Sequence, residues 1–227
     1  MDVLLAWNPA IIRFFLDNGA DVVTGSPFAL AFRERIRTAL GPYLECKRSH
    51  PELADKLQEQ ADRALRHFCY KGDIKWVSLL MWAGADPRTP GPEIDEEDDP
   101  ESYTTGLRNA CYGGNLEVLK RIKPDRGRDD LAQLVNYAAV LTKSEAVRYL
   151  LGCGANPNSK DNGGSPGLDR CLSDLAFRSF DPWSRNRPKS LYDIRRTVEC
   201  LKALIEHGAL WRPDDRKALN DVRRALC

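Results

Sequence analysis

The chain has 227 residues, of which 42% are hydrophobic and 30% are charged, and this balance is ordinary for a folded protein. No apolar run approaches the roughly 20 residues that a membrane-spanning helix needs, and the first residues lack the basic region that opens a secretion signal. The composition therefore excludes a membrane-spanning chain and a chain disordered along its whole length. We expect neither a secretion signal nor a membrane partner.

The net charge of +1 is the sum of two unequal parts, −5 over residues 1–100 and +6 over residues 101–227. Most of the negative part lies in residues 93–101, where seven of nine side chains are carboxylates. A general nucleic-acid binder normally shows a strongly basic domain. Nucleic acid is therefore not the partner that we expect.

Four helices are predicted where an apolar stretch ends in Gly-Ala, at residues 11–21, 77–87, 147–157 and 200–209. Glycine suits the left-handed residue that ends a helix, because a Cβ would clash there. The Asp or Asn with Pro that often follows is typical of turns. The expected cap residues are Gly19, Gly84, Gly154 and Gly208.

A second kind of helix, short and with small residues in mid-span, is predicted before three helix ends. Its copies are residues 65–73, residues 107–115 and, more weakly, residues 134–142. Small residues let neighbouring helices approach closely. Two Ser-Pro pairs predict further helix starts, with Ser as the cap and Pro at the first helical position: Ser26-Pro27 and Ser165-Pro166.

Together these phrases resemble the ankyrin repeat, whose pattern opens with Thr-Pro-Leu-His, carries Gly-His-Leu-Glu in mid-repeat and ends with Gly-Ala-Asp. The segment 116–119, after Gly114 and Asn115, is similar to the mid-repeat part. The resemblance covers most of the chain. It implies an all-α solenoid of about five to six helix-turn-helix units with projecting loops. A generic helical bundle is the alternative, but it would not explain the recurring Gly-Ala ends.

The four glycine caps are separated by 65, 70 and 54 residues, whereas an ankyrin repeat has a period of about 33. The first two intervals therefore each hide a degenerate repeat, and the third contains an inserted loop at about residues 180–190. We expect a single domain over residues 1–227. Its repeats are expected near residues 1–22, 26–48, 51–87, 104–124, 130–158 and 165–211, followed by a capping helix at 213–226.

Within the hidden repeats, Gly41 and Pro42 are expected to break a helix, and a longer helix is expected from Pro51 to about Tyr70. The first repeat is cut short, and no polar capping repeat precedes it, although solenoids usually need caps. Two alternatives stay open: the chain is a fragment of a longer protein, or a partner covers this end.

The residues show no signature of catalysis or metal binding. There is no glycine-rich phosphate loop, no His-Glu-x-x-His, and none of the seven cysteines forms a Cys-x-x-Cys pair. Cys69 and Cys111 are expected to be buried core residues, and His207 lies where a cation suits a helix end. We expect no enzyme, no catalytic residue, no cofactor and no metal, and free thiols in a cytoplasmic protein.

The resemblance also indicates a binding face, because the first helices of ankyrin repeats line a concave surface. Tyrosine is enriched at interfaces, since it offers a large ring and a hydroxyl group. The alternative is that these tyrosines pack between repeats. The residues that correspond to this face are His67, Tyr70, Asn109, Tyr112, Tyr137 and Val140.

The acidic run falls in a loop expected to project between Asp86 and Thr104. Its carboxylates repel one another, so we expect it to be mobile until it meets the basic surface of a partner, whose association it would speed. A solvated insertion is the alternative, and the run lacks the glycine and alternating ligands of a calcium loop. The acidic binding residues are Asp95, Glu96, Glu97, Asp98 and Asp99.

Two tryptophans leave alternatives open. Trp82 stands where ankyrin helices usually carry a charge, and it is either an exposed hot spot or folded over Ala85. Trp183 lies among basic residues that could bind an acidic protein, nucleic acid or lipid head groups, or the acidic loop of another copy, which would give self-association. These basic residues are Arg178, Arg185, Arg187 and Lys189.

The sequence thus favours a non-catalytic protein–protein interaction module, an adaptor or inhibitor, that binds a partner protein through its concave face and its loops. One alternative is the targeting domain of a larger enzyme, toxin or effector. Another is nucleic-acid binding through the basic C-terminal half.

Overall fold

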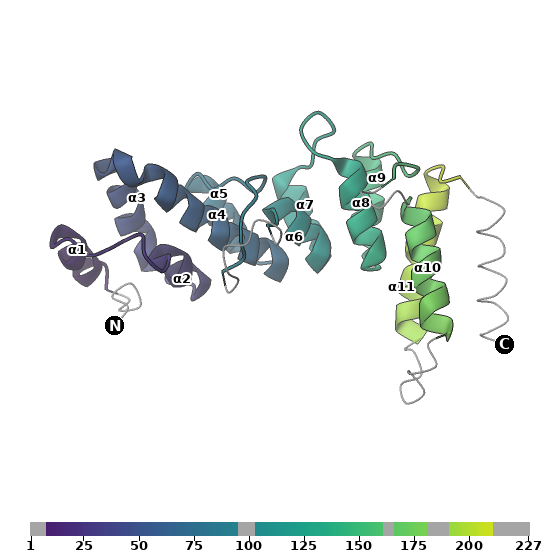
Figure 1. Ribbon diagram of the computed structural model, residues 1–227, viewed down its shortest axis with the longest axis horizontal. Coiled ribbons are helices and arrows are strands. Elements are labelled where there is room, and N and C mark those ends of the chain that lie inside the picture. The colour runs from purple at the N-terminus through teal and green to yellow at the C-terminus, as the bar shows by residue number, and fades with distance from the viewer. Residues whose placement is uncertain (1–7, 95–102, 161–165, 181–190, 211–227) are drawn as a thin grey trace. The chain divides into compact units, whose positions relative to one another are not determined.

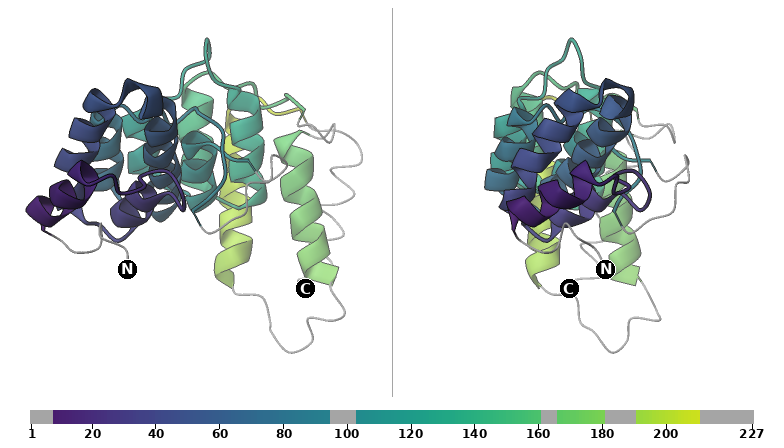
Figure 2. Two further views of the ribbon diagram at one scale, coloured as in Figure 1. Left: turned by 60° about the vertical axis from the view of Figure 1, so that its left-hand side comes forward. Right: turned by 90° about the vertical axis from the view of Figure 1, so that its left-hand side faces the viewer.

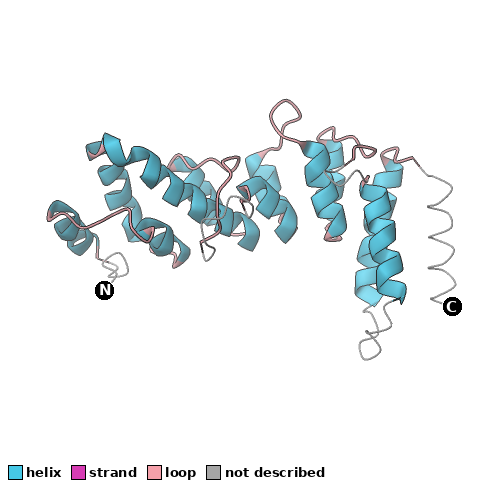
Figure 3. Cartoon of the chain, viewed as in Figure 1, coloured by secondary structure: helices cyan, strands magenta, loops and turns pink. Residues whose placement is uncertain are grey.

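The computed structural model describes residues 8–94, 103–160, 166–180 and 191–210 (Figure 1). These residues form α-helices joined by turns and loops, with two short 3-10 helices and two isolated β-bridges, Gly91–Thr104 and Lys160–Pro166. No β-strand occurs in these ranges (Figure 3). The all-α class expected from the sequence is therefore confirmed for the described part of the chain.

The chain divides into two units, Met1–Gly113 and Gly114–Cys227. Unit 1 centres on its longest helix, α4, which packs against α2, α3, α5 and α6 (Figure 2). The α-helices of unit 1 are α1 (Pro9–Asp17), α2 (Pro27–Arg33), α3 (Leu40–Ser49), α4 (Ala54–Lys71), α5 (Ile74–Trp82) and α6 (Gly106–Gly113).

An aromatic cluster forms much of the core of unit 1. The ring of Tyr43 lies 5.4 Å from the rings of Phe28 and Phe32, and Phe68 stacks on Trp76 at 5.2 Å. The Tyr43 hydroxyl donates a hydrogen bond to the Leu57 carbonyl, so its polar atom is satisfied inside the core.

Unit 2 contains two rows of packed helices. In one row α8 packs against α10, and in the other α9 packs against α7 and α11. The rows are joined because α8 packs on α9 and α10 packs on α11. The helices of unit 2 are α7 (Leu116–Ile122), α8 (Leu131–Val140), α9 (Ser144–Gly152), α10 (Gly167–Phe180) and α11 (Leu191–Glu206).

The four expected glycine caps share one set of backbone hydrogen bonds. The φ angles are 80° at Gly19, 99° at Gly84, 94° at Gly154 and 89° at Gly208. Each glycine N–H donates to the carbonyl three residues back, and each following alanine N–H donates to the carbonyl five residues back, over 2.9 to 3.2 Å. This is the Schellman helix end, and the predicted caps are confirmed.

Two local expectations are wrong. Gly41 and Pro42 do not break a helix, because both lie in the first turn of α3, where proline lacks only an N–H that has no acceptor within the helix. Ser26 precedes α2, with Pro27 first in the helix as expected, but it makes no side-chain cap. Gln60 Oε1 instead accepts the Phe28 N–H at 2.8 Å.

Other expectations are met or lie outside the described residues. The long helix expected from Pro51 begins as a 3-10 turn, Pro51–Leu53, and continues as α4. Four expected features lie outside the described residues: the start of the first repeat (residues 1–7), Ser165, the capping helix at 213–226, and all but Phe180 of the inserted loop at about residues 180–190, with Trp183. The single domain over residues 1–227 stays a prediction. Among the described residues, none of the helices has the length and apolar character to cross a membrane.

Candidate protein-binding surface

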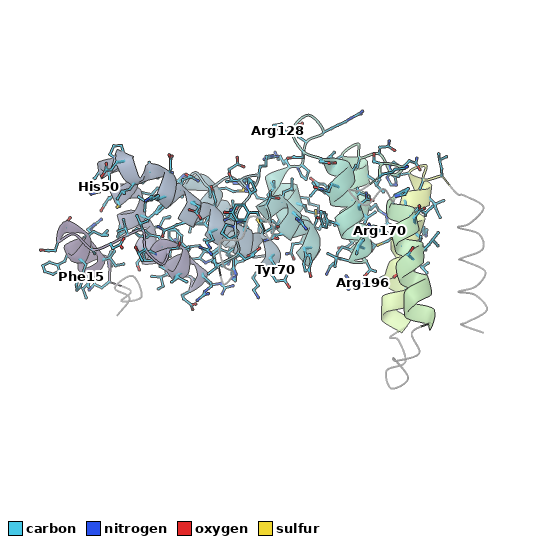
Figure 4. All side chains as sticks on the ribbon, in the orientation of Figure 1. Phe15, His50, Tyr70, Arg128, Arg170 and Arg196 are labelled. Carbon is cyan, nitrogen blue, oxygen red and sulfur yellow. The ribbon has the colours of Figure 1, made fainter. Side chains whose placement is uncertain are left out.

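Tyr70 and Tyr112 lie together at the surface of unit 1. They occupy the last turns of α4 and α6, which pack against each other, and their ring centroids are 5.7 Å apart. Tyr70 is 43% exposed and Tyr112 is 49% exposed. The Lys71 ammonium group lies 5.5 Å from the Tyr70 ring centroid, within the range of a cation–π contact. Figure 4 labels Tyr70 on α4.

Small residues bring the two tyrosines together, as the sequence indicates. A Cβ on Gly106 would lie 3.1 Å from the Cys69 Sγ and 3.2 Å from the Pro87 Cα. Glycine at this position therefore lets α6 approach α4 closely. Cys69 precedes Tyr70, and Gly106 begins the short helix that carries Tyr112, so this close contact joins the two helices that carry the rings.

His67 lies one turn before Tyr70 on α4 and is half-buried, with its ring against the edge of Phe68 at 5.3 Å. It is therefore on the side of α4 that carries Tyr70. His67 is less exposed than the two tyrosines, so it lies at the edge of the surface that they form.

Asn109 differs from the expectation of a surface residue, because it is only 7% exposed. Its amide nitrogen donates to the Arg66 carbonyl at 3.2 Å and to the Glu93 carboxylate. Its amide oxygen accepts the Thr104 hydroxyl at 2.9 Å. Asn109 thus joins α6 to the base of the inserted loop and offers no free group to a partner.

The acidic residues Asp95 to Asp99 lie outside the described residues, but both ends of their loop are described. Gly91 and Thr104 exchange two backbone hydrogen bonds of 3.0 Å, which close the base of the loop. The Arg63 Nε also donates to the Glu93 carbonyl at 2.9 Å. The loop therefore begins and ends at a fixed point on unit 1.

The side chain of Arg66, in α4, holds this base from inside. It is 1% exposed, and it donates to the Pro92 carbonyl at 3.1 Å and to the Thr89 carbonyl at 3.3 Å. A Cβ on Gly91 would lie 2.5 Å from Arg66 Nη2, so the guanidinium fills the place of a side chain there. Nη2 itself has no hydrogen-bond partner among the described residues. Burial lowers the pKa of Arg66, against the attraction of the Asp62 and Glu93 carboxylates.

Sequence reasoning missed Arg66, because arginine is normally expected at the surface. The available signal was weak: Gly91 stands between two prolines, Pro90 and Pro92, where a close backbone approach is plausible. The group that Gly91 approaches, the Arg66 guanidinium, belongs to helix α4, about 25 residues earlier in the chain. No local sequence pattern indicates that these two residues meet.

Trp82, at the end of α5, is 70% exposed, whereas Ala85 beside the cap is buried. This exposure agrees with the first of the two alternatives for this residue. The outward side of α5 thus presents a large aromatic surface that contributes little to the core of unit 1.

Tyr137 and Val140 belong to unit 2, where both lie on α8. Tyr137 is half-buried and Val140 is exposed at the end of the helix. The ladder of tyrosines expected over three repeats includes residues of both units, and it stays a prediction.

Cys69, Cys111 and His207 have structural positions in the described part of the chain. Cys69 and Cys111 are fully buried, as expected for core residues, and burial raises the pKa of Cys111 to about 12. Such thiols are unreactive at neutral pH. The His207 Nδ1 donates to the Ala203 carbonyl at 2.8 Å at the end of α11. No group of three metal-binding side chains occurs within the described ranges.

No protein-family model matches this chain, and no curated protein matches its sequence.

Proposed function

We propose that this chain is an ankyrin-type solenoid that binds another protein without catalysis, as an adaptor or an inhibitor. The observation that carries the binding proposal is the exposed pair of Tyr70 and Tyr112, held in contact on two packed helices. Large aromatic rings that stay exposed in a folded chain are typical of interfaces. Two rings already fixed by helix packing lose little further entropy on binding.

Two features of the helices support a repeat architecture. The same Schellman end follows α1, α5, α9 and α11. A left-handed residue follows four of the first helices, α2, α4, α6 and α8, at Arg35, Gly72, Gly114 and Thr142. Arginine and threonine adopt this conformation at a cost of about 1 kcal/mol. The left-handed turn recurs even where the residue is not glycine, and this recurrence supports a repeated unit of two helices.

The order of packing supports the same proposal within each unit. First helices pack on first helices in α2, α4 and α6 of unit 1 and in α8 and α10 of unit 2. Second helices pack on second helices in α7, α9 and α11. Stacking of this kind is expected of a solenoid, in which each repeat contacts only its neighbours.

The position of the inserted loop adds to the binding proposal. Asn109 and Arg66 fix the base of this loop on α4 and α6, the two helices that carry the tyrosines. We propose that the acidic run then meets a basic part of the partner and orients it against the rings. The free thiols of the described cysteines fit the cytoplasmic location that we propose.

Capture from native lysate tests the proposal. The double variant Tyr70→Ser/Tyr112→Ser should lose the captured partner at least tenfold, because it removes both rings, whereas Tyr70→Phe/Tyr112→Phe should retain most of it. Phe14→Ser is the matched control, since Phe14 is an exposed ring on α1. Equal capture by the wild type and the serine double variant, with both folded by circular dichroism, would contradict the proposal.

A further inference from the structure

A second feature of the surface lies in the loop that joins α7 to α8 in unit 2. Residues 123–130 project beyond these two helices (Figure 1), and Figure 4 labels Arg128 on this loop. The whole loop is described, and it stands where four of the other expected repeats have a Gly-Ala end. Lys123 takes the place of the cap glycine and adopts a left-handed φ of 58°.

The acidic side chains of this loop are engaged by its own backbone. The Gly127 N–H donates to Asp125 Oδ1 at 2.7 Å, and the Asp125 N–H donates to Asp129 Oδ2 at 2.7 Å. The carboxylate of Asp130 accepts the Gln133 N–H at 3.0 Å and so caps α8. Aspartate that bonds nearby backbone N–H groups stabilises a tight turn. The loop is therefore a closed turn with a defined shape.

The arginines of the same loop remain available. Arg126 and Arg128 are exposed, and neither forms an ion pair with any other residue that the structure describes. By contrast, Lys120 on α7 pairs with Glu117 at 2.7 Å. The stem of Arg126 runs beside the cap of α9, because a Cβ on Gly154 would lie 3.9 Å from Arg126 Cδ. A packed stem with a free guanidinium is partly ordered before any ligand arrives.

The charge pattern decides which partner fits. Residues 123–130 contain three basic and three acidic side chains, so the loop lacks the dense positive charge that binds a phosphate backbone. Two guanidinium forks two residues apart instead match separate carboxylates, each of which one fork can bind through two hydrogen bonds.

We propose that the loop of residues 123–130 is a docking site for an acidic segment of a partner protein. Arg126 and Arg128 bind its carboxylates, and Asp125 and Asp129 hold the turn that presents them. This site belongs to unit 2 and does not depend on the pair of Tyr70 and Tyr112.

The test uses the full chain and fluorescence anisotropy of a fluorescein-labelled peptide of four Glu-Asp pairs. We expect binding at low salt that weakens about tenfold in Arg126→Gln/Arg128→Gln, because two fork–carboxylate pairs are lost. The matched control is Arg195→Gln/Lys202→Gln, which removes two exposed cations of α11 and the same net charge. It should bind the peptide within twofold of the wild type.

Three results would overturn this docking site. Equal weakening in both double variants would show that the peptide responds to net charge alone. Tighter binding of a labelled 20-nucleotide RNA than of the peptide, lost in Arg126→Gln/Arg128→Gln, would show a polyanion site instead. A labelled peptide of four Gln-Asn pairs should not bind, and binding of that peptide would equally exclude carboxylate recognition.

Discussion

Two loops of this molecule are held in opposite ways. In unit 1, the base of the inserted loop is held by a buried cation, since Arg66 donates to the carbonyls of Thr89 and Pro92. In unit 2, the turn between α7 and α8 is held by surface carboxylates, since Asp125 and Asp129 accept backbone N–H groups. In the first loop the arginine is enclosed, and in the second the arginines are left outside.

The buried charge of Arg66 therefore has a structural role, whereas the charges of Arg126 and Arg128 are exposed to solvent. A guanidinium bonded to carbonyls in the interior can be removed only with a large loss of stability. A guanidinium whose neighbouring carboxylates are already bonded to the backbone is free to bind a partner. The same residue type thus supports the fold in unit 1 and offers a ligand group in unit 2.

The largest expected effect follows from removal of the buried cation. Arg66→Met should lower the free energy of unfolding by about 2–4 kcal/mol, because two carbonyls lose their donors and two nearby carboxylates lose a charge partner. Urea unfolding followed by circular dichroism measures this. Arg63→Met is the control, and it should cost about 1 kcal/mol because the Glu93 carbonyl loses the hydrogen bond from Arg63 Nε. A loss below 1 kcal/mol in Arg66→Met would show that the arginine does not hold the loop base.

A smaller effect is expected in the turn of unit 2. Asp125→Ala should cost about 1 kcal/mol, because the Gly127 N–H loses its acceptor, and hydrogen exchange at Gly127 should speed up. Asp125→Asn keeps an acceptor oxygen in the same place and should stay close to the wild type. Equal exchange rates in the alanine variant and the wild type would mean that the carboxylate does not close the turn.

The smallest effect concerns the carboxylate next to Arg66. Burial raises the pKa of Asp62, against hydrogen bonds from the Asp86 N–H and Gln58. The native state therefore binds this proton more tightly than the unfolded state, and Asp62 lowers stability increasingly as pH rises through its folded pKa. The Asp62→Asn variant should have a higher free energy of unfolding than the wild type, and this difference should be larger at pH 7 than at pH 4. Urea midpoints at both pH values measure this, and a stability difference that does not change with pH would contradict it.

The sequence predicted the features that depend on a residue's own backbone. The caps at Gly19 and Gly154 follow from the absence of a Cβ at a left-handed position, which is a local property. The burial of Cys69 and Cys111 was expected from the small residues of the recurring short phrase, although both lie near the ends of their helices rather than in mid-span. The all-α class was expected from the resemblance of the recurring phrases to the ankyrin repeat, and those phrases are local patterns.

The sequence could not predict features that depend on distant contacts. Asn109 was expected on a surface, but Glu93 and the Arg66 carbonyl, 16 and 43 residues away, enclose it. Ser26 has the local pattern of a cap, yet Gln60, 32 residues from Phe28, takes that role. The left-handed backbone of Lys123 could not be predicted either. A lysine in this conformation has no sequence pattern that separates it from a lysine inside a helix.

Site-specific photo-crosslinking tests most directly the claim that Tyr70 and Tyr112 form a protein-binding surface. The substitution Tyr112→p-benzoylphenylalanine keeps a large ring in place, and illumination in cells that express the chain joins it to whatever it touches. We expect one discrete protein adduct, identified by mass spectrometry, that is lost when Tyr70→Ser is added and is absent with Phe14→p-benzoylphenylalanine. No adduct at Tyr112, or the same adduct at both positions, would contradict a protein-binding surface at this place.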